Sequence, residues 1–239
     1  MTDDCASPSE RRAFLQNVVS AGAAVASASL LSGCATTSAN TNPNAQTARE
    51  APQWDMSWQS KLGRYKTVYD APEPQNGTPM YTVALTIAGY KAALPKTAGQ
   101  FTPVLVLRHN ASFTTLNDSM WKRVRAHTRL TPKDVADAYV NRNPFIEHVA
   151  GAAGGLVSAT SSLAALVKEG TIILVCNRAL GILARGLMGA EPGQFATVEL
   201  ALEEIWKNLV PGAYVMPNGL FAVAAAQDAG CGYVRIMPD

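Results

Sequence analysis

The chain has no surplus of charge of either sign. Its 20 lysine and arginine residues nearly balance its 18 aspartate and glutamate residues, and the formal net charge is +2. No basic run or stripe is present that would neutralise a row of phosphates. We therefore expect no nucleic-acid partner.

The motifs that hold nucleotides, activate a serine or bind a metal are also absent. The glycine-rich stretch at residues 151–155 follows no clear strand and lacks the lysine of a P-loop, and no Gly-x-Ser-x-Gly segment occurs. The three histidines, His109, His127 and His148, show no metal-ligand spacing such as i, i+4. We therefore expect neither a cofactor nor a metal.

No apolar stretch reaches the roughly 20 residues with which a helix spans a bilayer. The nearest is residues 18–33, which carry no charge and follow the paired Arg11 and Arg12. This pattern is typical of an export signal, and the paired arginines resemble the twin-arginine translocation motif, which implies a precursor that folds before it crosses the inner membrane. The short apolar run favours cleavage over retention.

The signal ends in Leu31-Ser32-Gly33-Cys34, which resembles a bacterial lipobox. The resemblance implies that residues 1–34 form the signal, that Cys34 is lipidated and that it becomes the new N-terminus. Two alternatives are a retained apolar anchor and an ordinary cleaved signal that leaves Cys34 as a spare thiol. With lipidation, the protein lies on the periplasmic side of a bacterial membrane, and Ala35 resembles the residue after the lipid site in outer-membrane lipoproteins.

Residues 35–53 contain Thr, Ser, Asn, Ala, Gln and Pro and almost no large apolar residue. Such a stretch cannot bury enough surface to offset the entropy lost on ordering. We expect a flexible tether between the lipid at Cys34 and one folded domain at residues 54–239.

Strand and helix patterns alternate along this domain. Strands are predicted at residues 65–70, 101–107, 171–175, 212–216 and 233–237, and helices at 77–94, 116–124, 156–167, 178–188, 197–209 and 218–229. Residues 125–155 follow no clear pattern, and we expect a long excursion there. Parallel neighbours need a crossover, which a helix supplies, and unbroken apolar strands indicate a sheet covered on both faces. We predict an α/β fold, a five-stranded, mostly parallel sheet with helices on both faces.

Cys176 stands directly after the buried run at 171–175 and before a helical pattern. In such sheets ligands bind outside the carboxyl ends of the strands, and the N-terminus of the following helix favours an anion such as a thiolate. Arg178 or Arg185 is a candidate cation beside it. Cysteine is also a frequent core residue, so a passive thiol is the alternative. We expect no disulfide with Cys231, because the two lie at opposite edges of the sheet, too far apart to bond.

Other polar residues are candidates for the same sheet edge. His109, after the strand at 101–107, is a candidate base or hydrogen-bond partner for Cys176, or a structural histidine that caps a loop. Asn110, Asn177 and Arg178 are candidates for binding an anion, and the two asparagines alternatively satisfy turn backbone.

Three segments follow one another in the second half of the chain: Gly170-Thr-Ile-Ile-Leu-Val-Cys176-Asn-Arg-Ala-Leu, Val210-Pro-Gly-Ala-Tyr-Val-Met-Pro-Asn-Gly219 and Ala226-Gln-Asp-Ala-Gly-Cys-Gly-Tyr-Val234. Together they resemble the DsrE/DsrF-like family. The resemblance is clearest from about 170 to 236 and extends to 65–124. It implies a five-stranded α/β sheet, a homo-oligomer, and a persulfide-carrying cysteine at the position of Cys176.

Two functions remain open. The first is an exported, membrane-anchored DsrE-like protein that carries sulfur as a persulfide on Cys176, with a sulfur donor or acceptor protein as partner. The second is a non-catalytic periplasmic binding or scaffolding module in which the thiol is buried and passive. Whether the protein is an enzyme is left open.

Overall fold

The computed structural model describes residues 54–125, 141–148 and 157–236. The predicted signal at 1–34, the predicted tether at 35–53 and most of the excursion at 125–155 lie outside the described residues. The described elements are η1 (Ser57–Lys61), β1 (Tyr65–Ala71), η2 (Gln75–Gly77), α2 (Thr78–Ala93), η3 (Ala98–Gln100), β2 (Phe101–Leu107), η4 (His109–Thr115), α3 (Asp118–Val124), α4 (Leu163–Lys168), β3 (Ile172–Cys176), α5 (Asn177–Ala190), α6 (Val198–Lys207), β4 (Ala213–Met216), α7 (Gly219–Asp228) and β5 (Gly232–Arg235).

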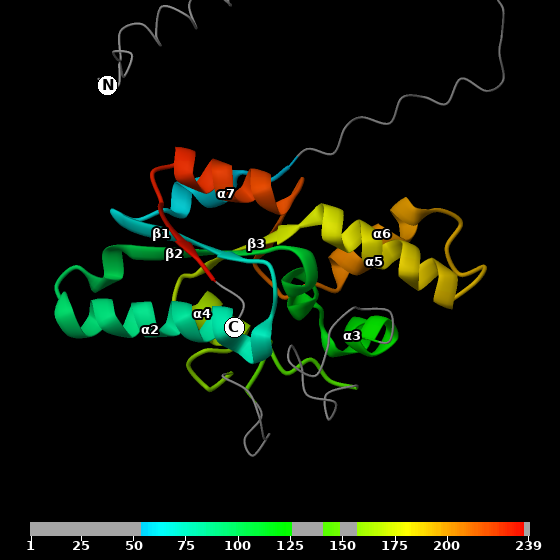
Figure 1. Cartoon of the computed structure of the whole chain (residues 1–239), viewed down its shortest axis with the longest axis horizontal. Helices are drawn as coiled ribbons and strands as arrows, with labels where there is room; N and C mark the ends of the chain where they lie inside the picture. The colour runs from blue at the N-terminus through cyan, green and yellow to red at the C-terminus, as the bar shows by residue number, and fades with distance from the viewer. Residues whose placement is uncertain (1–53, 126–140, 149–156, 237–239) are drawn as a thin grey trace, which may run out of the picture. The chain divides into compact units, whose positions relative to one another are not determined.

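The described strands form a five-stranded sheet in the order β4-β3-β2-β1-β5 (Figure 1). Each neighbouring pair of strands is parallel. The predicted α/β fold is therefore confirmed, and the sheet described here is parallel throughout. The last strand returns to the far side of β1, so the two ends of the domain's sequence pair with each other.

Helices cover both faces of the sheet, and the apolar side chains divide accordingly. On one face, α2, α3, α4, α5 and α6 bury residues against Leu105, Leu107 and Val175. On the other face, η1 contributes Trp58 and α7 contributes its alanines, which pack against a second set of strand residues that includes Val104. Figure 1 shows α7 on one side of the sheet with α2 and α4 on the other. Because helices cover both faces of the sheet, every residue of β2 is buried.

The predicted helix at 156–167 is shorter than expected. Residues 157–162 form turns, and α4 begins at Leu163, where the Ser162 side chain accepts a hydrogen bond from the N–H of Ala165. The Ser161 hydroxyl accepts from the N–H of Ser158 at 2.7 Å. Serine hydroxyls that bond to nearby backbone compete with helix formation, which explains the late start.

The other predicted helices begin and end within a few residues of the predicted positions. Asn218 is the N-cap of α7, and its side chain accepts a hydrogen bond from the N–H of Phe221 at 2.9 Å. Asn117 is the N-cap of α3. None of the described helices combines the length and the apolar character that a membrane crossing requires.

Candidate functional site

Cys176 is the last residue of β3 and the N-cap residue of α5. Its backbone is extended, with φ −76° and ψ 106°, and its side chain makes no capping hydrogen bond to the helix. The first N–H groups of a helix have no partner within the helix. The thiol therefore lies beside polar backbone groups that favour a negative charge.

The thiol is buried but not sealed. Cys176 is 7% exposed, and it lines a pocket of about 260 Å³. We call this the Cys176 pocket, and its lining consists of His109, Asn110, Phe113, Cys176, Arg178, Ala179, Ile182 and Leu183. His109, Arg178 and Ile182 are exposed, so the pocket is open to solvent between η4 and the start of α5. The structure thus places Cys176 at the carboxyl end of β3 and in an open pocket.

His109 lines the pocket from η4, which follows the neighbouring strand β2. Leu107 pairs with Val175 in the parallel register of β2 and β3, which brings the residues after the two strands side by side. His109 has a φ of +47°, an uncommon conformation for a residue with a side chain. Such backbone conformations cluster at functional sites. The two side chains line the same pocket, and the described hydrogen bonds include none between the imidazole ring and Cys176.

The three predicted anion-binding residues differ in their surroundings. Arg178 is exposed and lines the pocket. Asn110 also lines it, but its amide nitrogen donates to Glu73 at 2.8 Å and so ties η4 to the loop after β1. Asn177 is not among the lining residues, because its side-chain oxygen accepts the indole N–H of Trp206 on α6 at 3.0 Å. The structure thus gives Asn177 a packing role.

A second polar cluster lies at the same sheet edge, and the sequence did not reveal it. Arg108 directly follows β2 and donates two hydrogen bonds to Asp70 of β1, at 2.5 Å and 3.0 Å. The hydroxyl of Tyr233 on β5 donates to the same carboxylate at 3.1 Å. Asp70 is buried, at 4% exposure, and a buried carboxylate is stable only when paired and hydrogen-bonded. The cluster joins three strands.

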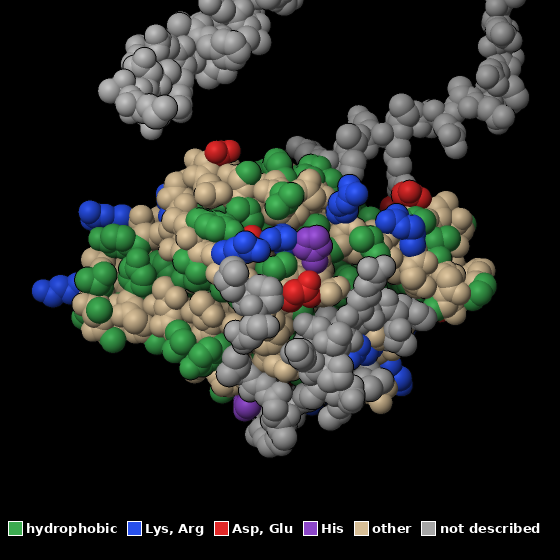
Figure 2. Space-filling view, in the orientation of Figure 1, with side chains coloured by type: hydrophobic (Ala, Val, Ile, Leu, Met, Phe, Trp, Pro, Cys, Tyr) green, Lys and Arg blue, Asp and Glu red, His purple; other side chains and the backbone are tan. Residues whose placement is uncertain are grey.

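Arg108 links this cluster to the thiol. The pKa of Arg108 is raised, chiefly by its hydrogen bond to Asp70, and negative charge on Cys176 makes a smaller contribution in the same direction. Figure 2 shows basic, acidic and histidine side chains gathered near the middle of one face. Arg108 directly precedes His109 of the Cys176 pocket, and a bidentate ion pair fixes its position.

Gly219 makes room for Arg108. A Cβ atom at position 219 would stand 2.4 Å from the Cβ of Arg108 and 2.9 Å from its Cδ. The start of α7 can therefore approach the arginine only because residue 219 has no side chain. This close approach completes the packing around the Asp70–Arg108 pair.

The second buried thiol lies elsewhere. Cys231 directly precedes β5, whereas Cys176 ends β3, and the strands β2 and β1 lie between them. Both cysteines are free, as predicted. Burial raises the pKa of the Cys231 thiol, and nearby Lys66 opposes this effect. Cys231 therefore has the properties of a core thiol.

One sequence signal for the missed cluster was present. Asp70 is a charged residue between Tyr69 and Ala71 in the second half of β1, and Arg108 directly follows a strand that is wholly buried. Buried charges require partners, so these two residues were candidates for each other. Tyr233 had no such signal, because its contact depends on β5 lying beside β1.

Among the described residues, no three His, Cys, Asp or Glu side chains gather in a way that could hold a metal ion. When the chain is compared with models of protein families, with curated proteins and with solved structures, nothing matches it. The likeness to the DsrE/DsrF-like family, and the function that it implies, therefore stay predictions.

Proposed function

We propose that the protein carries sulfane sulfur as a persulfide on Cys176. The observation that supports this proposal is the position of the thiol, which is held at the end of β3 and lines a solvent-open pocket. A thiolate is the nucleophile in sulfur transfer. The N-terminus of α5 and Arg178 both favour the negative charge.

His109 has a distinct role in this proposal. It lines the pocket from η4, and an imidazole can act as a general base. In the resting protein it does not bond to Cys176. We infer that it receives the thiol proton, directly or through one water, when a sulfur donor approaches.

The wider setting is part of the same proposal. We infer that the protein is an exported, DsrE-like homo-oligomer, anchored on the periplasmic side through a lipid at Cys34, and that it exchanges sulfur with a donor or acceptor protein. Comparing a Cys34→Ala variant with the natural protein in membrane and soluble fractions tests the anchor. An unchanged membrane fraction would contradict it.

The persulfide proposal is tested by mass spectrometry of the purified protein after exposure to a sulfane donor. We expect a gain of one sulfur atom, about 32 Da, on the peptide that contains Cys176. The Cys176→Ser variant loses this gain and the Cys231→Ser variant keeps it. Equal loading of the two cysteines, or no loading of Cys176, would overturn the proposal.

The low exposure of the thiol favours a second candidate, a binding or scaffolding module with a passive cysteine. Cys231 provides an internal reference, because it is 8% exposed against 7% for Cys176. Under native conditions, a functional Cys176 reacts with iodoacetamide much faster than Cys231. If both thiols require unfolding before they react, the passive module is the correct assignment.

A further inference from the structure

We propose that the Cys176 pocket accepts small organic sulfur donors that combine an anionic sulfur group with an apolar body, in preference to inorganic sulfur anions. This inference rests on the proposed function, because it names the class of donor for the same thiol. It is drawn from the lining of the pocket, in which polar residues stand at the starts of η4 and α5 and apolar residues follow them along the same two elements. We call these two groups the polar side and the apolar side.

The polar side of the pocket suits an anion. Cys176 is the N-cap of α5, Arg178 lies in the first turn of that helix, and His109, the first residue of η4, lines the same pocket. Arg178 is exposed, and its guanidinium is a cation that can donate hydrogen bonds to an anion. A negatively charged sulfur group placed over the thiol would meet this guanidinium and the helix N-terminus together.

The apolar side of the pocket offers no favourable contact to an inorganic anion. It consists of Phe113 from η4 and of Ala179, Ile182 and Leu183 from the next turns of α5. Ile182 is 56% exposed, and its side chain stands at the solvent-facing rim. An apolar group of a donor would cover this isoleucine and be removed from water, which is favourable in proportion to the area covered.

The size of the pocket agrees with a small organic molecule. Its volume of about 260 Å³ lies just below the range of roughly 300–1,000 Å³ found for sites of drug-sized ligands. An anion of a few atoms would leave most of that volume to water. A single aromatic ring with a charged substituent fills it far better.

The transfer step balances with an organic thiosulfonate as donor. The Cys176 thiolate attacks the outer sulfur of R–SO2–S⁻, and a new S–S bond forms to the cysteine. The bond between the two donor sulfurs breaks, and its electron pair leaves with the sulfinate R–SO2⁻. The protein holds Cys176–S–S⁻, so the charge is conserved and no further oxidant or reductant is needed.

The test compares three donors that differ mainly in their apolar part: benzenethiosulfonate, methanethiosulfonate and thiosulfate. The rate of the 32 Da gain at Cys176 is measured for each donor and divided by the rate with N-acetylcysteine, which removes differences in intrinsic reactivity. One methylene in an apolar pocket changes specificity by about 10–200-fold. We expect the corrected rate with benzenethiosulfonate to exceed the other two by about tenfold or more.

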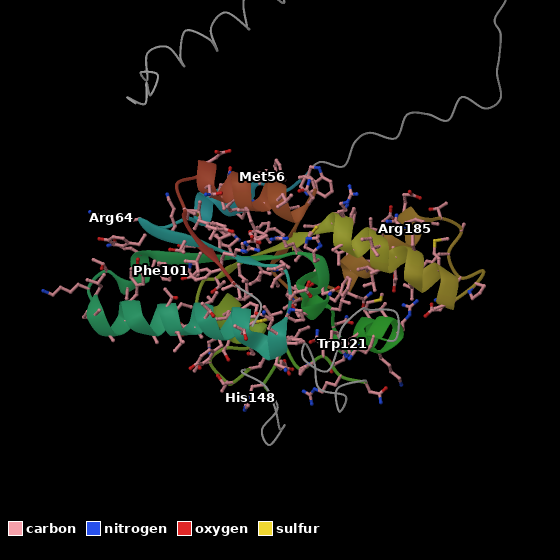
Figure 3. All side chains as sticks on the ribbon, viewed as in Figure 1. Met56, Arg64, Phe101, Trp121, His148 and Arg185 are labelled. Carbon is pink, nitrogen blue, oxygen red and sulfur yellow. The ribbon has the colours of Figure 1, made fainter. Side chains whose placement is uncertain are left out.

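Matched variants locate the effect. Ile182→Ser should lose most of the preference for the aromatic donor, whereas Leu85→Ser, at an equally exposed apolar position on α2, should keep it. Arg178→Gln should slow all three anionic donors, while Arg185→Gln, further along the same helix (Figure 3), should not. Circular dichroism of each variant checks that it is folded.

The outcomes separate the two proposals. Equal corrected rates for the three donors, or a preference for thiosulfate, would overturn the inference and leave the persulfide function intact. Retention of the aromatic preference in Ile182→Ser would also overturn it. A failure of Cys176 to gain sulfur from any donor would overturn the proposed function, and the inference with it.

Discussion

The replacement Gly219→Ala tests the packing that fixes Arg108 beside the candidate site. The added methyl carbon would lie 2.4 Å from the Cβ of Arg108, and no rotamer of the arginine relieves this contact because a Cβ position is set by the backbone. Overpacking of this kind costs about 1–3 kcal/mol. A contact of 2.4 Å between two Cβ atoms can be relieved only by a backbone shift, which belongs at the upper end of that cost. Alanine in place of a helical glycine returns at most about 1 kcal/mol, so we expect a net loss of about 2 kcal/mol in the free energy of unfolding.

The measurement is urea unfolding followed by circular dichroism, with the free energy obtained by linear extrapolation. Gly89→Ala is the matched control, because Gly89 is also a helical glycine and a Cβ there would meet nothing within 4 Å. That variant should gain up to about 1 kcal/mol. If Gly219→Ala were as stable as the natural protein, the close approach of α7 to Arg108 would be refuted.

Two further predictions concern the polar cluster. Asp70→Ala should lower the free energy of unfolding by about 3–5 kcal/mol, because it leaves Arg108 without its buried partner. The control Lys91→Ala breaks the exposed pair with Glu169 and should lower the free energy of unfolding by less than about 1 kcal/mol. Equal urea midpoints for the two variants would contradict this. The pKa of Tyr233 is raised, first by desolvation and then by its hydrogen bond to Asp70. The phenol therefore ionises more easily in the unfolded chain than in the folded protein. The free energy of unfolding should fall as the pH rises above about 10. Alkaline unfolding of Tyr233→Phe should show a shallower fall, and an unchanged slope would contradict the assignment.

The sequence allowed the strands and the position of the thiol to be predicted, because both depend on local patterns. The apolar run before Cys176 predicts a buried strand, and the helical pattern after it predicts which end of that strand carries the thiol. The cap at Asn218 was equally readable, since the residue type and the start of the helix stand next to each other.

The features that the sequence did not reveal depend on which strands become neighbours. Tyr233 and Asp70 are 163 residues apart, and they meet only because β5 pairs with β1. The backbone of His109 and the partner of Asn177 are likewise set by tertiary packing, which local propensity does not encode. The pocket is therefore partly predicted, and its apolar wall emerged only from the fold.

The placement of β5 beside β1 bears on how the polypeptide is made. Among the described strands, β1 leaves the ribosome first and β5 last, so one edge of β1 has no partner until the residues between these two strands have been made. At about 5–20 residues per second the intervening polypeptide takes roughly 10–30 s to appear. An open strand edge is a template for aggregation, so the nascent chain has to be shielded, by a chaperone or by its own growing length, during that interval.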